Sequence, residues 1–293
     1  MKTVNWGIIG LGLISKDSMI PELLKSDFCK VYAIGSRSKI PEDYLPEAKH
    51  YTYDEVFEDP NVDAVYIAVP NALHTELSIK AMQHGKHVLC EKPLACTKEE
   101  GELMVRVAKE NNVLLMEAFM YRYGKKFAEL KDALASGKLG KIVGLQGNHG
   151  YTLDWKSPAR EDPELGGGCL YDVGCYVIDC MNYITSEKVV NGSACMKEKG
   201  GVDWHTAASI QFESGICGSI QCWFDGAENK KIVLIGEKDT LTINGIYEPG
   251  EDETLYKDEA EAFAKAILGE DSYIMPIEDT LKNLEVLEML MNA

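Results

Sequence analysis

The sequence lacks every arrangement of cysteines that marks a zinc or disulfide framework. Its nine cysteines form no CxxC pair, and several lie in apolar runs, where cysteine behaves as a small hydrophobic residue. Histidine and acidic residues are likewise not clustered at the spacing of metal ligands, and His149 and His205 fall in predicted strands, where we expect them to pack. We therefore expect reduced thiols, no metal site and a cytoplasmic location.

Long apolar runs, a basic excess and a cationic leader are absent as well. The longest apolar stretches fall far short of the roughly 20 residues that span a bilayer, and the first residues enter a predicted strand directly. Lys and Arg number 30 against 47 Asp and Glu, a net charge of -17, which repels phosphate backbones and anionic membranes. We expect no nucleic-acid or membrane partner, whereas a small anionic cofactor remains compatible with local dipoles.

Strands and helices alternate over the first 120 residues. Such alternation predicts right-handed crossovers and a doubly wound parallel sheet. With 293 residues, 45% of them apolar, two domains are favoured over one. We expect strands at residues 4–9, 30–36, 62–70, 87–90 and 114–118, and helices after residue 15, at 74–84 and from residue 97.

The pattern changes near Tyr121, where strands follow one another without intervening helices. This predicts a mostly antiparallel sheet. The expected fold class is therefore α/β, with a Rossmann domain at 1–120 and a substrate-binding and dimerisation domain at 121–293, whose last helices could pack back on the first domain. We expect its strands at 144–149, 189–196, 206–212, 218–224 and 231–235, and its helices at 127–134, 170–184, 259–268 and 278–291.

The first predicted strand ends in a glycine turn with the pattern G-x-G-x-x-S. The turn follows a strand and opens a helix, the setting in which this pattern binds a dinucleotide pyrophosphate. Serine in the third position is small enough to replace glycine, which serves helix packing there. We assign cofactor binding to the turn residues Gly10, Leu11, Gly12, Leu13 and Ile14.

The end of the second predicted strand indicates which dinucleotide is bound. An NAD site has an acidic residue there to accept from the ribose 2′-hydroxyl, whereas this chain has Ser36, Arg37 and Ser38. Hydroxyls and a guanidinium suit a 2′-phosphate through charge-assisted hydrogen bonds. We predict NADP(H), with NAD possible if Arg37 is merely solvated.

Two further strand ends are expected at the same crevice, because ligands bind at the carboxyl ends of parallel strands. Val69, Pro70 and Asn71 end one strand, and His74 opens the next helix, so these four are assigned to the nicotinamide half of the cofactor. The other strand runs from His87 into Glu91-Lys92-Pro93. A lysine there can hold a positive charge beside a group that gains or loses a proton; the alternative is a surface lysine.

The strings GLGLIS, AVPNALHTE, HGKHVLCEKPLA and GGGCLYDVGCY together resemble the glucose-fructose oxidoreductase/inositol dehydrogenase/rhizopine catabolism (Gfo/Idh/MocA) family. The string EAFMYRY and the tyrosine at position 176 are most similar to the dimeric dihydrodiol dehydrogenase and D-xylose dehydrogenase branch. The resemblance implies a Rossmann domain followed by an open-sheet α/β domain, whose exposed sheet face commonly forms a dimer. It also implies that Glu91 and Lys92 lie beside the nicotinamide.

The family's D-x-x-x-H pair falls on Asp172 and Tyr176, so tyrosine replaces the histidine. The resemblance then implies proton transfer by Tyr176. The spacing agrees, because residues four apart share one helix face, and a nearby ammonium such as Lys92 would favour the phenolate. The alternatives are a core tyrosine and an aspartate favoured by the helix dipole. Arg160 and Trp155 either line the mouth of the site or belong to a surface loop.

These residues predict an NADP(H)-dependent oxidoreductase acting on a secondary alcohol or ketone of a sugar, cyclic diol or polyol, with Lys92, Asp172 and Tyr176 as catalytic residues. Two alternatives stay open: an NAD-dependent inositol or sugar dehydrogenase, and a non-catalytic regulator that senses the cofactor on the same fold.

Overall fold

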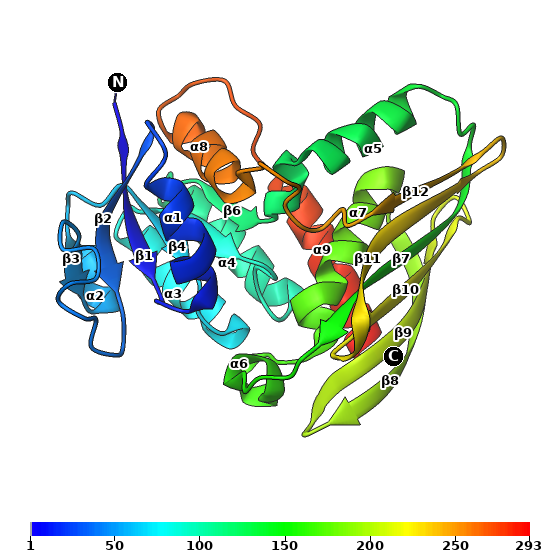
Figure 1. The fold of residues 1–293 in the computed structure, drawn as a ribbon, viewed down its shortest axis with the longest axis horizontal. Helices are drawn as coiled ribbons and strands as arrows, with labels where there is room; N and C mark the ends of the chain where they lie inside the picture. The colour runs from blue at the N-terminus through cyan, green and yellow to red at the C-terminus, as the bar shows by residue number, and fades with distance from the viewer. Residues whose placement is uncertain (1) are drawn as a thin grey trace. The chain divides into compact units, whose positions relative to one another are not determined.

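The computed structural model describes residues 2–293, which divide into two compact units (Figure 1). The first unit contains the residues up to Ala95, together with Glu99–Met120 and Thr254–Ile277. The second contains Cys96–Lys98, Tyr121–Glu253 and Glu278–Ala293. The chain therefore leaves the first unit and later returns to it.

The first unit is built on a six-stranded parallel sheet in the order β3-β2-β1-β4-β5-β6. This is the doubly wound parallel sheet that the alternation predicted. The edge strand β3 and the helix after it were not predicted, because both are short and polar. The strands are β1 (Val4–Ile9), β2 (Cys29–Gly35), β3 (Lys49–Tyr51), β4 (Ala64–Ile67), β5 (His87–Glu91) and β6 (Leu115–Ala118).

Helices cover this sheet and complete its core. The indole of Trp6 on β1 packs against Phe263 of α8 (Leu255–Ile267), with ring centroids 6.0 Å apart and both side chains fully buried. Burying two aromatic side chains stabilises the fold by several kcal/mol, so α8 is part of this core although it is distant in sequence. The other helices are α1 (Ile20–Leu23), α2 (Tyr53–Glu58), α3 (His74–Gln83) and α4 (Lys98–Glu110).

The second unit is built on another six-stranded sheet, in the order β12-β11-β7-β10-β9-β8. All its strand pairs are antiparallel except β7 with β10, so the predicted mostly antiparallel sheet is confirmed. The strands are β7 (Ile142–Thr152), β8 (Val189–Lys199), β9 (Val202–Phe212), β10 (Cys217–Trp223), β11 (Asp225–Gly236) and β12 (Thr240–Asn244); the helices are α5 (Lys125–Ala135), α6 (Pro158–Glu161), α7 (Cys175–Thr185) and α9 (Ile277–Met291).

One face of this sheet carries α7 and α9 (Figure 1). Glycine makes the close approach possible, because a Cβ on Gly147 would lie 2.3 Å from Val177 of α7. The opposite face is lined by small and polar side chains around a shallow concavity of about 520 Å³. Along β9 the side chains alternate between buried and exposed, as expected for a sheet with one covered face.

A buried ion-pair network ties α7 and α9 to the start of the second unit. Arg122 donates from Nε and Nη2 to Asp179 of α7 at 2.9 and 2.6 Å, and from Nη1 to Asp279 of α9 at 2.9 Å. Tyr121 and Asn283 also donate to Asp179. The side chains of Arg122 and Asp179 are fully buried, so these hydrogen bonds replace the solvent that both charges have lost.

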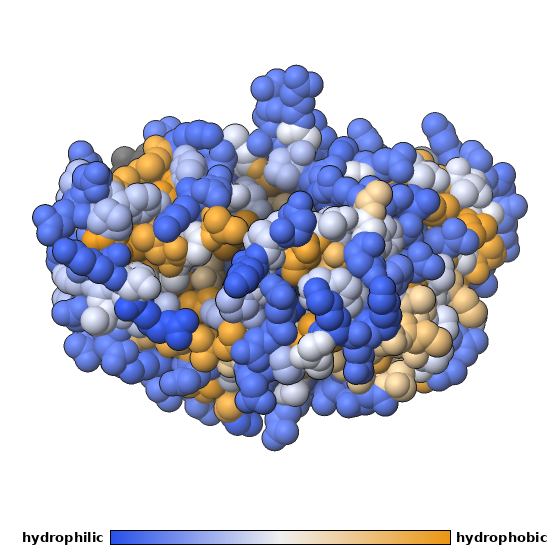
Figure 2. All heavy atoms as spheres, turned by 60° about the horizontal axis from the view of Figure 1, so that its bottom comes forward, coloured by the Kyte–Doolittle hydropathy of each residue, from blue (hydrophilic) through white to orange (hydrophobic). Residues whose placement is uncertain are grey.

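Hydrophilic residues dominate the face shown in Figure 2, in keeping with the net charge, and apolar residues form small groups between them. Within residues 2–293, no helix combines the length and the apolar character needed to cross a bilayer. All nine cysteines are free thiols.

Candidate active site

The glycine turn after β1 has the geometry of a dinucleotide cradle. Gly10 has a φ of +94°, and a Cβ there would lie 2.3 Å from the carbonyl oxygen of Ala68, so only glycine fits. A Cβ on Gly12 would meet nothing within 4 Å, which leaves space for a ligand to approach the backbone. The buried hydroxyl of Ser15 donates a hydrogen bond to the Gly10 carbonyl oxygen at 2.7 Å and so stabilises the conformation of the turn.

The end of β2 presents hydroxyls and one guanidinium. The Ser38 amide donates to the Ser36 hydroxyl at 3.1 Å, which turns the loop back on itself. Arg37 is exposed and forms no ion pair within residues 2–293. Its guanidinium is therefore available to an anion.

One histidine side chain lies between the loop that follows β4 and the loop that follows β5. His74 opens α3 and is fully buried, with Nδ1 2.9 Å from the Pro93 carbonyl oxygen and Nε2 2.9 Å from that of Val69. Burial, together with the charge of Lys92, lowers the pKa of His74 to about 4. Both ring nitrogens face backbone carbonyls, and the neutral ring donates a hydrogen bond to one of them, so His74 lies between the two loops. Its assignment to the cofactor site stays a prediction.

The strand end at Glu91 and Lys92 is held from inside the first unit. Tyr66 of β4 donates to Glu91 Oε1 at 2.5 Å, and the Lys92 amide donates to Oε2 at 3.3 Å. Glu259 of α8 is also buried here, and burial followed by the charge of Glu91 raises its pKa well above the usual range. Glu91 orients the backbone that carries Lys92.

In the second unit, Asp172 is engaged by two donors. Its Oδ2 accepts from Arg160 Nε at 2.9 Å and from the Tyr151 hydroxyl at 2.8 Å. The neighbouring carboxylate raises the pKa of Arg160 above its ordinary value, so the guanidinium keeps its charge beside Asp172. The indole of Trp155, 44% exposed, stacks on Tyr151 with centroids 5.7 Å apart.

Tyr176 lies within an aromatic cluster on α7. Its ring is 8% exposed and is 5.1 to 5.8 Å from the rings of His149, Tyr121 and Tyr247. His149 of β7 also stacks on Tyr247 at 5.1 Å. The cluster fixes the orientation of the Tyr176 ring and limits the access of water to it.

The sequence analysis missed two structural features around Asp172 and Tyr176. Residues Leu170–Gly174 form a π-helical turn rather than regular helix, so Asp172 lies in a wider turn than the four-residue spacing assumed. Such turns often occur at functional sites. Tyr151 and Tyr247 were not considered at all, because no local pattern links residues of β7 and the loop after β12 to α7.

The comparisons with known proteins agree with this architecture. The model described as "Oxidoreductase family, NAD-binding Rossmann fold" matches residues 4–119, and that of the GFO/IDH/MocA C-terminal domain matches residues 127–242. D-xylose 1-dehydrogenase (NADP(+)) 2 of Haloferax volcanii is 31% identical over 77% of this chain and 71% of its own length. Trans-1,2-dihydrobenzene-1,2-diol dehydrogenase of Mus musculus is 28% identical over 92% of this chain and 82% of its own length.

Among solved structures, a 3-ketoreductase from Actinomadura kijaniata in complex with NADP and TDP-benzene superimposes with a TM-score of 0.90 at 23% identity. The match covers 99% of this chain and 98% of that one, and at this identity it bears on the fold alone. Taken together, the glycine turn, the two sheets and the matched domains show that this chain belongs to the Gfo/Idh/MocA family of NAD(P)-dependent oxidoreductases.

Proposed function

We propose that the protein transfers a hydride between NADP(H) and a secondary alcohol or ketone on a sugar, cyclic diol or related polyol. The observation that carries the proposal is the end of β2, where Ser36, Arg37 and Ser38 stand in place of a carboxylate. The relative named for D-xylose is also named for NADP(+), and the mouse relative is named for a cyclic diol.

The cofactor would lie along the carboxyl edge of the first sheet. The turn from Gly10 to Ile14 would hold its pyrophosphate, and Ser36, Arg37 and Ser38 its 2′-phosphate. Val69, Pro70 and Asn71 would contact the nicotinamide half together with Lys92, and Glu91 and His74 would support those loops. The bound nicotinamide supplies the hydride.

The proton chemistry would belong to Tyr176 and Lys92. During reduction, Tyr176 would donate its phenolic proton to the carbonyl oxygen of the substrate, and the ammonium of Lys92 would stabilise the phenolate that remains. Asp172 would orient the substrate hydroxyl. Arg160 and Tyr151 would hold the Asp172 carboxylate in place. In oxidation the same groups would act in reverse.

A substrate panel tests the proposal. Purified protein is assayed with NADP and NAD against aldoses, inositols, cyclic trans-diols and dicarbonyls, and absorbance of the reduced nicotinamide is recorded. We expect turnover with at least one cyclic polyol or its ketone, and faster turnover with NADP. Tight NADP binding without turnover on any substrate would favour the non-catalytic regulator instead.

Substitution of Arg37 tests the cofactor preference. We expect Arg37→Ala to weaken NADP binding by about 10- to 100-fold, the loss of a hydrogen-bonded charge pair, and to leave NAD binding within about twofold. Dissociation constants are measured by nicotinamide fluorescence. Arg106→Ala on α4, which removes another exposed arginine from the same unit, is the control. Equal NADP and NAD affinities in wild type and in Arg37→Ala would contradict the 2′-phosphate assignment.

We place a homodimer contact on the open face of the second sheet. That face has no helix over it among residues 2–293, and its side chains are small and uncharged over most of the concavity, as at Ser193, Ser209 and Ser219. Small side chains let a second sheet approach closely. Sedimentation of wild type at micromolar concentration as a monomer would contradict this placement.

A further inference from the structure

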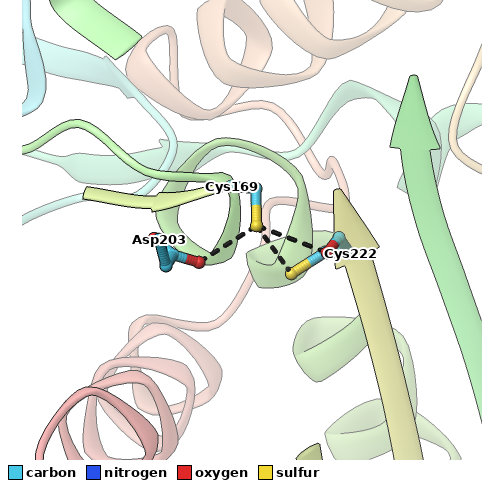
Figure 3. Close-up of side chains that lie close together, drawn as sticks. All are labelled: Cys169, Asp203 and Cys222. Atoms are coloured by element: carbon cyan, nitrogen blue, oxygen red, sulfur yellow. Dashed lines mark hydrogen bonds between the residues drawn. The ribbon is translucent and has the colours of Figure 1, made fainter. Parts of the chain in front are cut away.

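Three side chains that could bind a metal meet in the interior of the second unit. They are Cys169, directly before the π-helical turn, Asp203 of β9 and Cys222 of β10. Figure 3 shows the three side chains turned toward one another, and one ligand atom of each lies within 4.8 Å of the others. All three residues are at most 3% exposed.

The distances resemble those of a tetrahedral ion site. Cys169 Sγ lies 3.5 Å from Cys222 Sγ and 3.0 Å from Asp203 Oδ2. A zinc ion with bonds of about 2.3 Å to sulfur and 2.0 Å to oxygen would separate two sulfurs by about 3.8 Å and sulfur from oxygen by about 3.5 Å. The atoms of these two pairs would therefore need to spread by only about half an ångström.

A further buried oxygen lies beside the three side chains. The Thr206 hydroxyl is 3.8 Å from Cys169 Sγ and donates to Asp203 Oδ2 at 2.6 Å, so it would move by about 0.7 Å to become a fourth tetrahedral ligand. The carboxylate itself is fixed from both sides. The Leu170 amide donates to Oδ2 at 2.9 Å, and a Cβ on Gly168 would lie 2.0 Å from Oδ1.

The charge of the cluster also favours a cation. Asp203 forms no ion pair within the described chain. A carboxylate buried in this way needs compensation of its charge. A divalent ion would supply that compensation.

From this geometry we propose that Cys169, Asp203 and Cys222 bind one zinc ion, with the Thr206 hydroxyl in the fourth position. Two sulfurs and a carboxylate suit zinc among the common divalent ions. Binding would replace the thiol protons with metal bonds and release them to solvent, without any change of oxidation state. The site is separate from cofactor and substrate binding and does not rest on the proposed function.

The bound ion would join three chain segments that are far apart in sequence. Cys169 and Cys222 are 53 residues apart, so no motif spacing reveals the pair, and the sequence predicted no metal site. Because Asp172 and Tyr176 follow Cys169 within seven residues, the ion would also anchor the segment that carries them. It would serve a structural role, since all four positions are filled by protein.

Metal content tests the inference directly. Full-length protein is expressed in zinc-supplemented medium, dialysed, and analysed by inductively coupled plasma mass spectrometry. We expect about one zinc per chain in wild type and less than about a tenth of that in Cys169→Ser and Cys222→Ser. The matched control is the double variant Cys195→Ser, Cys217→Ser, which removes the two exposed cysteines and should keep its zinc.

Cobalt provides a second readout on wild type. Chelator-treated protein exchanged into Co²⁺ should show thiolate-to-metal charge transfer and the intense visible bands of tetrahedral coordination. Three results would overturn the inference: wild type holding no more zinc than Cys169→Ser, zinc lost only in the surface double variant, or an intact mass two hydrogens lower with Cys169 and Cys222 joined in a disulfide.

Discussion

Replacing Lys92 with methionine is expected to lower turnover at least ~100-fold, the low end of general acid–base contributions, and to change NADP binding only a few-fold. Methionine keeps most of the length of the side chain but removes the ammonium. A tyrosine with an ordinary pKa near 10 is a poor proton donor and acceptor at neutral pH. If Lys92 supplies the positive charge that we propose for the reaction, its loss would leave the Tyr176 phenolate unstabilised. Turnover and cofactor affinity are measured separately, by steady-state kinetics and by nicotinamide fluorescence.

Two companion variants sharpen this result. Lys80→Met changes a lysine on α3 of the same unit that pairs with Asp54, and it should keep wild-type turnover. Tyr176→Phe should lose activity as Lys92→Met does, and the double variant should be little worse than either single variant, because residues that act as a unit are not additive. Near-normal turnover in Lys92→Met would remove Lys92 from the mechanism.

Replacing Arg122 with methionine is expected to destabilise the second unit by about 3–5 kcal/mol, the usual cost of breaking a buried ion pair from one side. The change leaves the Asp179 carboxylate buried with only neutral donors, Tyr121 and Asn283. It also disconnects Asp279 of α9 from its salt bridge. Urea unfolding followed by tryptophan fluorescence measures the effect, because three of the four tryptophans, Trp155, Trp204 and Trp223, lie in this unit.

An exposed ion pair supplies the control for Arg122. Lys197 of β8 pairs with Asp225 of β11 at 2.6 Å, but its side chain is 69% exposed, so Lys197→Met should cost no more than about 1 kcal/mol. Similar losses of stability in the two variants would show that burial of the Arg122 pair has no energetic consequence.

The sequence predicted the fold wherever a pattern was local. The strands from Val4 to Ala118 are apolar runs bounded by turns, and the change of pattern at Tyr121 indicated the second sheet. It failed for β3, where three polar residues pair along a sheet edge, and for the parallel contact between β7 and β10, which joins strands about 70 residues apart. Neither pairing has a signal within a short window.

The residues of the candidate site also fall into those that a local pattern predicted and those that it did not. The glycine turn and Arg37 could be proposed from sequence because each belongs to a short loop directly after a predicted strand. The partners of Asp172 could not: Tyr151 and Arg160 approach it from a strand and a loop, and sequence alone gave Arg160 no more weight than a surface residue. His74 was assigned to the cofactor from its place at a helix start, yet its ring spans two backbone carbonyls, a contact that only folding creates.

The packing of Phe263 against Trp6 has a consequence for synthesis on the ribosome. The first unit cannot bury Trp6 against Phe263 until residues from Thr254 to Ile277 have left the exit tunnel, so the second sheet is translated before the first core is complete. Translation proceeds at roughly 5–20 residues per second. The apolar surface around Trp6 therefore stays exposed on the order of ten seconds between synthesis of the first strands and synthesis of α8. Chaperone dependence during translation should therefore be greatest in that interval, and fragments ending near residue 120 should aggregate.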